Sequence, residues 1–154
     1  MDLALTEKQE ILKTTTRDFM DRECPKDTLL YLDETSSGYS NEIWQKTASI
    51  GWLGMLIPEC YGGSASSLTD AAVVYEQIGR GPLPGPFFSS AVLGALTILE
   101  VGTTEQHEKY LPSIAKGSDI ATLALTEPDY GWGPDSVTMR AQPTHNGYIL
   151  SGTK

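Results

Sequence analysis

Apolar residues recur at helical spacing over about the first three-quarters of the chain, with polar residues between them. Several of these stretches begin at a Ser or Thr that can cap a helix, and Thr6 with Gln9 fits a capping box. Most of them end at Gly or Pro, which terminate helices. The pattern predicts a mainly α domain, with helices over about residues 6–24, 40–51, 67–81 and 86–99 and a shorter one from Thr103 that Pro112 interrupts.

The stretch 86–99 differs from the others because it is apolar nearly all round. A helix without a polar face is normally buried in the protein interior, so we expect this one to be central. Exposed apolar surface drives association. Val92, Leu93 and Leu96 on this helix therefore predict that the isolated chain forms a weak dimer or a concentration-dependent oligomer.

The character of the sequence changes after Gly117. Residues 120–126 are rich in β-compatible types, residues 136–141 alternate at period two, and Asn146-Gly147 is a turn signal that precedes a strand over 148–151. Two or three strands are marginal without a packing partner. The pattern predicts a boundary near residue 118, with an all-helical domain over 1–118 and an unfinished β domain over 119–154.

Charge and cysteine content remove several classes of function. The chain has 154 residues, with 11 Lys and Arg against 20 Asp and Glu, a net charge of −9. This balance argues against a nucleic-acid-binding face, which needs clustered cations. No apolar run is long enough for a membrane helix, and the first residues lack signal-peptide features. The two cysteines, Cys24 and Cys60, are far apart, so we expect reduced thiols and a cytoplasmic protein.

Easily recognised catalytic and metal motifs do not occur. The sequence has no Gly-x-Ser-x-Gly elbow, no P-loop and no Gly-x-Gly-x-x-Gly. His107 and His145 have no ligand partners at metal-binding spacing, so no metal site is expected and both are read as exposed polar residues. By itself, the pair Gly131 and Gly133 predicts only a loop with unusual backbone angles.

Six segments carry the functional information because they occur in a recognisable order. They are 51–59 (GWLGMLIPE), 61–63 (YGG), 76–80 (EQIGR), 110–112 (YLP), 123–128 (LALTEP) and 147–154 (GYILSGTK). Together they resemble the acyl-CoA dehydrogenase family of FAD-dependent oxidoreductases. The resemblance covers nearly the whole chain, from Thr6 to Lys154.

The resemblance implies an N-terminal helical domain over 1–118 and the first strands of an incomplete β-barrel domain over 119–154. A C-terminal four-helix domain follows in the family and supplies the glutamate base that removes the α-proton of an acyl-CoA thioester. We therefore expect this chain to be a fragment that contains no catalytic base and is inactive alone. Glu59, Glu76 and Glu127 are not expected to replace that base.

The flavin contacts implied by the resemblance do fall within this chain. The family uses the strand matched by Leu123, Ala124, Leu125 and Thr126 to donate hydrogen bonds to the flavin ring of FAD. Many members continue with Gly-Ala-Gly-Ser-Asp, whose Ser lies near the flavin phosphates. This chain has a longer loop with Pro134 at that place, and proline offers neither hydroxyl nor N–H.

Two consequences of that departure are open. Either Gly131 and Gly133 supply backbone amides to the cofactor instead, or the contact with the pyrophosphate is weaker. The family also places flavin contacts on the strand beyond Lys154.

The central helix of the family lines part of the acyl pocket, which points to Phe88, Ser89 and Val92 as substrate-binding residues. Core packing is the alternative for each of them. The implied partners are an acyl-CoA substrate, electron-transfer flavoprotein or a similar acceptor, and further subunits in a homo- or hetero-oligomer involved in fatty acid metabolism.

Two other functions remain compatible with the sequence. A non-catalytic partner subunit would keep the fold and lose the chemistry, and Pro134 motivates that alternative. A cofactor-free helical interaction module is permitted by composition alone.

Overall fold

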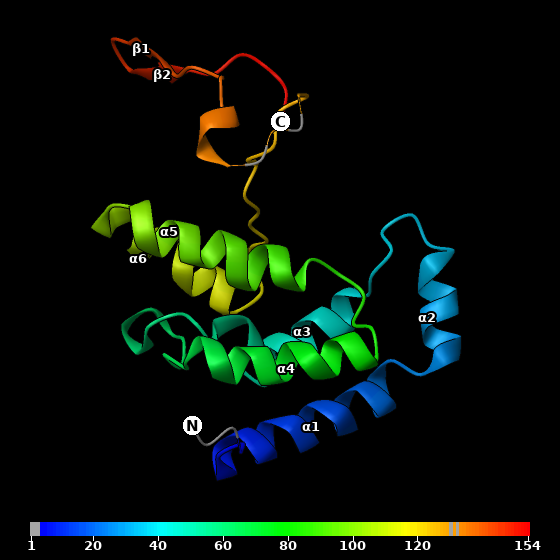
Figure 1. Ribbon diagram of the computed structural model, residues 1–154. Coiled ribbons are helices and arrows are strands. Elements are labelled where there is room, and N and C mark those ends of the chain that lie inside the picture. Colours follow the sequence, from blue (N-terminus) through cyan, green and yellow to red (C-terminus); the bar gives the residue numbers. More distant parts are fainter. Residues whose placement is uncertain (1–3, 130, 132) are drawn as a thin grey trace. The chain divides into compact units, whose positions relative to one another are not determined.

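The computed structural model describes residues 4–129, 131 and 133–154, which form two compact units (Figure 1). One unit extends to Thr122 and the other is Leu123–Lys154. The helices of the first unit are α1 (Glu7–Glu23), α2 (Lys26–Asp33), α3 (Asn41–Ser49), α4 (Leu68–Arg80), α5 (Ala95–Val101) and α6 (Thr104–Ala115), with short 3-10 turns η1 (Trp52–Gly54) and η2 (Glu59–Tyr61) and a π-helical segment η3 (Ser89–Gly94). The second unit contains the turn η4 (Pro134–Ser136) and strands β1 (Gln142–Thr144) and β2 (Gly147–Ile149).

Local capping begins most of these helices as the sequence predicts. Thr6 and Thr103 each close a capping box with the glutamine three residues later, and Ser40 accepts a hydrogen bond from the Ile43 N–H. Such boxes satisfy N–H groups that the first helical turn leaves unpaired. The residues that begin the helices therefore already indicate the mainly α class of the first unit.

The principal core of the first unit is an aromatic cluster between α1, α3, α4 and the turn η1. The Trp52 ring contacts Phe19 edge-on at 4.9 Å between centroids and Phe87 at 6.3 Å. Trp44 is buried, and its indole N–H donates to the Gly117 carbonyl at 2.9 Å. That bond satisfies a polar group which burial would otherwise leave unpaired. A smaller cluster under α5 and α6 consists of Ile57, Ala95, Leu111, Ile114 and Ala115.

The turn at residues 61–63 owes its glycines to close backbone contact. A Cβ on Gly63 would lie 2.0 Å from the Ile57 carbonyl oxygen, and Gly62 has a φ of +84°. The Ser64 N–H donates to the Gly54 carbonyl and the Ala65 N–H to that of Ile57. A side chain at position 63 would push the backbone of residues 63–65 away from that of residues 54–57 and break these hydrogen bonds.

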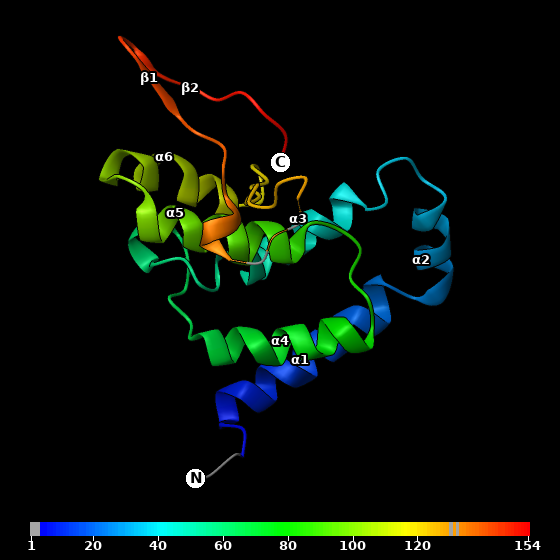
Figure 2. The same cartoon turned by 45° about the horizontal axis from the view of Figure 1, so that its top comes forward.

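The predicted helix over 86–99 forms, and it continues to Val101 through a π-helical segment at Ser89–Gly94 (Figure 2). Most of its residues from 87 to 95 are buried, which agrees with a central helix. Phe88 is the exception because its side chain is 53% exposed. Val92 is buried and Leu93 and Leu96 are half-buried, so the exposed apolar surface of this unit lies at other positions.

Three local predictions for the first unit are wrong. Helix α2 is absent from the sequence prediction because a proline normally ends a helix, yet Pro25, with a φ of −63°, is the N-cap from which α2 begins. Pro112 does not interrupt the last helix, which runs through it to Ala115. His107 is half-buried, and its Nε2 lies 2.9 Å from the Ile98 carbonyl oxygen.

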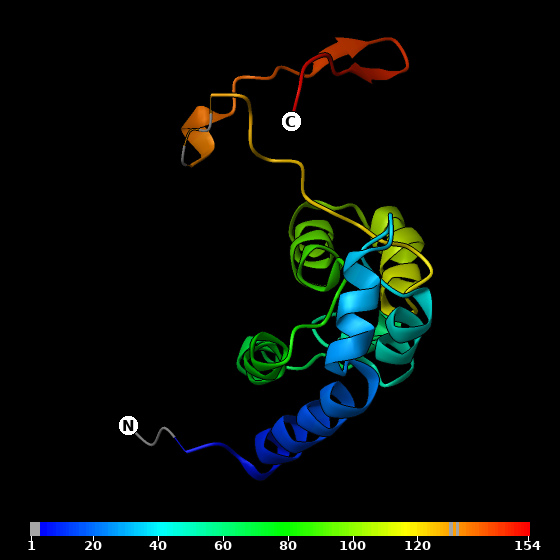
Figure 3. The same ribbon diagram turned by 90° about the vertical axis from the view of Figure 1, so that its right-hand side faces the viewer.

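The described residues of the second unit form one antiparallel hairpin, the orange-red pair of arrows in Figure 3. Gln142 faces Ile149 and Thr144 faces Gly147, so the turn consists of His145 and Asn146, one residue earlier than predicted. The strands predicted over 120–126 and 136–141 are wrong, because neither segment has a hydrogen-bonded strand partner among the described residues. Residues with a high propensity for β-structure do not form a β-strand unless a neighbouring strand is available for hydrogen bonding.

Within the described ranges, no helix is both long and apolar enough to cross a membrane. The assignment of 119–154 to the beginning of a β-barrel domain stays a prediction.

Candidate functional site

The segment 123–126 belongs to no helix or sheet, and its hydrogen-bond donors are unpaired within the described part of the chain. Leu123, Ala124, Leu125 and Thr126 are all exposed. Their four backbone N–H groups and the Thr126 hydroxyl have no acceptor among the residues that the structure describes. Unpaired exposed donors in sequence can bind a polar or anionic edge of a ligand. The predicted flavin-binding residues therefore fit a ring that gains negative charge when it is reduced.

Glu127, directly after this segment, collects four hydrogen bonds on its carboxylate. The Thr138 N–H and hydroxyl donate to Oε2 at 2.8 and 2.6 Å, and the Met139 N–H donates to Oε1 at 2.9 Å. Lys154 Nζ lies 2.8 Å from the same Oε1. Hydrogen bonds from Lys154, first, and then from Thr138 and Met139 lower the pKa of Glu127 to about 2. Glu127 is thus an ionised structural group, a role that its position before Pro128 did not reveal.

The two loop glycines have steric reasons to be glycine. A Cβ on Gly131 would lie 2.2 Å from the Ser136 Cβ, and Gly133 has a φ of +102°. The Gly133 carbonyl accepts the Ser136 N–H at 3.2 Å and its hydroxyl at 2.6 Å. These bonds occupy a carbonyl, and neither glycine amide has an acceptor among the described residues, so an amide contact with a cofactor stays a prediction.

The predicted substrate residues lie together on the helix that contains η3. Phe88 is exposed and Ser89 half-buried, while Val92 is buried one turn further along. The Phe88 ring packs edge-on against Tyr75 at 5.7 Å between centroids. The Tyr75 hydroxyl is buried without a hydrogen-bond partner in the described part of the chain, and desolvation raises its pKa. A polar group without a partner therefore lies close to Phe88.

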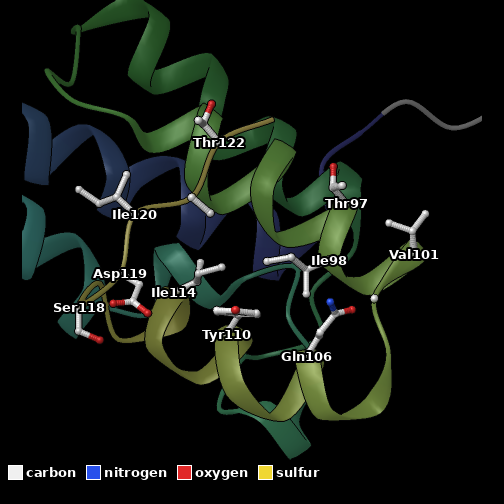
Figure 4. Close-up of a pocket in the computed structure, with 12 residues that line it drawn as sticks. Thr97, Ile98, Val101, Gln106, Tyr110, Ile114, Ser118, Asp119, Ile120 and Thr122 are labelled. Atoms are coloured by element: carbon white, nitrogen blue, oxygen red, sulfur yellow. The ribbon is translucent and has the colours of Figure 1, made fainter. Parts of the chain in front are cut away.

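A groove of about 720 Å³ that the sequence did not predict runs between α5, α6 and the segment 118–122 (Figure 4). Ile98, Val101, Tyr110, Ile114 and Ile120 supply apolar side chains to it, and Thr97, Gln106, Ser118, Asp119 and Thr122 supply polar ones. None of the predicted site residues lines it. Its signal in the sequence is weak, because its apolar residues come from three separate segments.

Groups able to act as a catalytic base or metal ligand are sparse. Glu59 and Glu76 are exposed on the first unit, and Glu127 is held ionised by its hydrogen bonds. No set of three His, Cys, Asp or Glu able to hold a metal ion occurs in residues 4–129, 131 and 133–154. The hydrogen-bond donors at 123–126 are therefore the groups of the candidate site that are best able to bind a ligand.

Comparisons with known proteins point to one family. The pattern of the acyl-CoA dehydrogenase N-terminal domain matches residues 6–118. A 3-(aryl)acrylate reductase from Clostridium sporogenes is 34% identical over 152 residues, which cover 97% of this chain and 40% of the relative. This chain spans about two-fifths of the length of the first curated relatives that it matches.

Solved structures show the same similarity in space. An acyl-CoA dehydrogenase from Bacillus anthracis, solved in complex with FAD, is 30% identical with a TM-score of 0.82, over 96% of this chain and 26% of that one. The ChsE4-ChsE5 complex from Mycobacterium tuberculosis is 28% identical with a TM-score of 0.86, over 99% of this chain and 40% of that one.

Proposed function

Because this chain belongs to the acyl-CoA dehydrogenase family, we propose that it is part of an FAD-dependent enzyme that dehydrogenates acyl-CoA thioesters between the α and β carbons. The observation that carries the proposal is the row of unpaired donors at residues 123–126. They are the residues at which the family resemblance expects flavin contacts. The FAD-bound relative from Bacillus anthracis supports the choice of cofactor.

The chain's own residues would bind and orient the cofactor. Bound FAD supplies the acceptor for the hydride that leaves the β carbon. The N–H groups of Leu125 and Thr126 and the Thr126 hydroxyl would donate hydrogen bonds to the ring edge where negative charge develops. Donors already in place stabilise such charge without the cost of reorganising water.

The acyl group would lie against the helix that contains η3. Phe88, Ser89 and Val92 are our candidates for that pocket wall, and the unpartnered Tyr75 hydroxyl beside Phe88 supports a ligand nearby. The α-proton needs a carboxylate base, and neither the exposed Glu59 and Glu76 nor the hydrogen-bonded Glu127 supplies a suitable one. We propose that the base comes from a further domain of the full-length enzyme.

Electrons would pass to electron-transfer flavoprotein or a similar acceptor, and the enzyme would work as a homo- or hetero-oligomer. The similarity to the ChsE4-ChsE5 complex from Mycobacterium tuberculosis supports the hetero-oligomer. It also keeps a second function open, that of a non-catalytic partner subunit. Pro134, which replaces a family hydroxyl near the flavin phosphates, favours that second function.

Equilibrium dialysis against FAD tests the cofactor assignment. We expect the chain to retain FAD weakly, and Thr126→Ala to raise the dissociation constant about two- to tenfold, since a hydrogen bond between neutral groups contributes about 0.5–1.5 kcal/mol. Thr122→Ala is the matched control, because Thr122 lines the groove of Figure 4 and not the donor segment. Equal binding by wild type and Thr126→Ala, or a loss confined to Thr122→Ala, would contradict the proposal.

A further inference from the structure

In the second unit, an ion pair lies next to Thr126, the residue whose N–H and hydroxyl are both proposed to contact the flavin. Lys154 Nζ lies 2.8 Å from Glu127 Oε1 and also donates to the Leu125 carbonyl at 3.1 Å. Its two partners are the residues immediately before and after Thr126. We propose that Glu127 and Lys154 form a clamp that fixes the backbone at Thr126, which makes both of them positioning residues for the flavin contact. The inference rests on the proposed function.

The clamp joins three segments that are distant in the sequence. Besides Lys154, the Glu127 carboxylate accepts the N–H groups of Thr138 and Met139 and the Thr138 hydroxyl. Residues 138 and 139, and Lys154 beyond the end of β2 at Ile149, are thereby bound to Glu127 beside the donor segment. The Lys154–Leu125 bond is the one hydrogen bond that joins residues 123–126 to the described part of their own unit.

The two side chains of this ion pair are together less exposed than those of the other ion pairs among the described residues. The Glu127 side chain is 8% exposed and the Lys154 side chain 20% exposed. Exposed ion pairs contribute little because water and salt screen them, whereas charge-assisted hydrogen bonds in a shielded place are short and strong. The low pKa of Glu127 keeps the carboxylate charged at neutral pH, so all of its bonds are charge-assisted.

A rigid backbone at Thr126 would help the donor segment to stabilise charge on the flavin. Donors stabilise developing charge well only when they are held in position before the charge appears. Removing the Lys154 amine would free the Leu125 carbonyl, and the peptide that carries the Thr126 N–H would then rotate. The unpaired donors would remain present but would no longer be aligned.

Backbone ¹⁵N relaxation on the whole chain tests the clamp without any cofactor. We expect a rigid Thr126 amide in the wild type, with an order parameter near 0.85, and a value below about 0.6 in Lys154→Met and Glu127→Gln. Lys154→Arg should restore rigidity, because a guanidinium can donate to both oxygens. The matched controls are Lys116→Met and Asp129→Asn, because both residues are exposed and their side chains form no hydrogen bond or ion pair with the described residues.

Dialysis with FAD on the same variants tests the positioning role. We expect about tenfold weaker binding in Lys154→Met and Glu127→Gln, with recovery in Lys154→Arg. An unchanged order parameter at Thr126 would overturn the clamp whatever the cofactor does. A mobile Thr126 with unchanged FAD affinity would overturn the positioning role. If Thr126 is rigid in the wild type and mobile in both variants, but the wild type retains no FAD, the proposed function is refuted and the clamp is supported as a structural device only.

Discussion

At the scale of single residues, Asp70 shows how one carboxylate joins two helices. Its Oδ2 lies 2.8 Å from Lys8 Nζ and its Oδ1 accepts from Gln9 Nε2 at 3.0 Å, so the first turn of α1 is bound to the first turn of α4. The same side chain completes a capping box with Ser67. Asp70 is 7% exposed, and hydrogen bonds from Lys8, first, and then Gln9 lower its pKa to about 2.

This lowered pKa predicts how stability depends on pH. The folded value lies below the unfolded value of about 3.9, so the contribution is complete above pH 4 and is lost as pH falls through 4 towards 2. Asp70→Asn should lower the free energy of unfolding by about 1–2 kcal/mol at pH 7. Urea unfolding followed by circular dichroism at pH 7, 4 and 2.5 measures both effects. The gap between wild type and variant should narrow as pH falls, and a constant gap would contradict this assignment.

At the scale of elements, the segment 118–122 crosses the π-helical segment at a glycine. A Cβ on Gly94 would lie 2.6 Å from the Ala121 Cβ, and the Ala121 N–H donates to the buried Ser90 hydroxyl at 3.2 Å. The π-helical segment and the chain that leads to the donor segment are therefore packed directly on each other. Such segments often occur at functional sites.

Substitution by alanine should have opposite effects at Gly94, where this contact leaves no space, and at Gly79, where space is free. Gly94→Ala should destabilise the first unit by about 1–3 kcal/mol, because the added methyl displaces Ala121. Gly79→Ala on α4 should stabilise it by about 0.5–1 kcal/mol, since a Cβ there meets nothing within 4 Å and alanine favours a helix. Chemical unfolding of both variants decides the point. Equal stability of Gly94→Ala and wild type would show that the crossing is not tightly packed.

Elements that depend on near neighbours were predictable from the sequence, and elements that depend on distant ones were not. The caps at Thr6 and Thr103 are confirmed because a capping box needs only four consecutive residues. The strand predicted over 120–126 fails because a strand also needs a partner, which the described residues do not provide. The Glu127 contacts were missed for a similar reason, since they join residues 11 to 27 positions apart.

At the scale of the whole molecule, the residues that indicate the family and the residues that indicate the cofactor lie in different units. The family match covers residues 6–118, in the first unit, whereas the candidate flavin donors begin at Leu123 in the second. The similarity to the relative from Clostridium sporogenes extends over 97% of the chain and so includes that second unit. The fold of the first unit therefore supports the family, and the donors of the second support the cofactor.

The central claim, that residues 123–126 bind the flavin, is tested most directly by mapping FAD onto the chain. Backbone amide resonances of the ¹⁵N-labelled protein would be followed during a titration with FAD, with adenosine diphosphate as the control for the nucleotide half. We expect FAD to shift the amide resonances of Leu123, Ala124, Leu125 and Thr126, and adenosine diphosphate to leave them unchanged. Shifts confined to the groove between α5 and α6, or no shifts at saturating FAD, would contradict it.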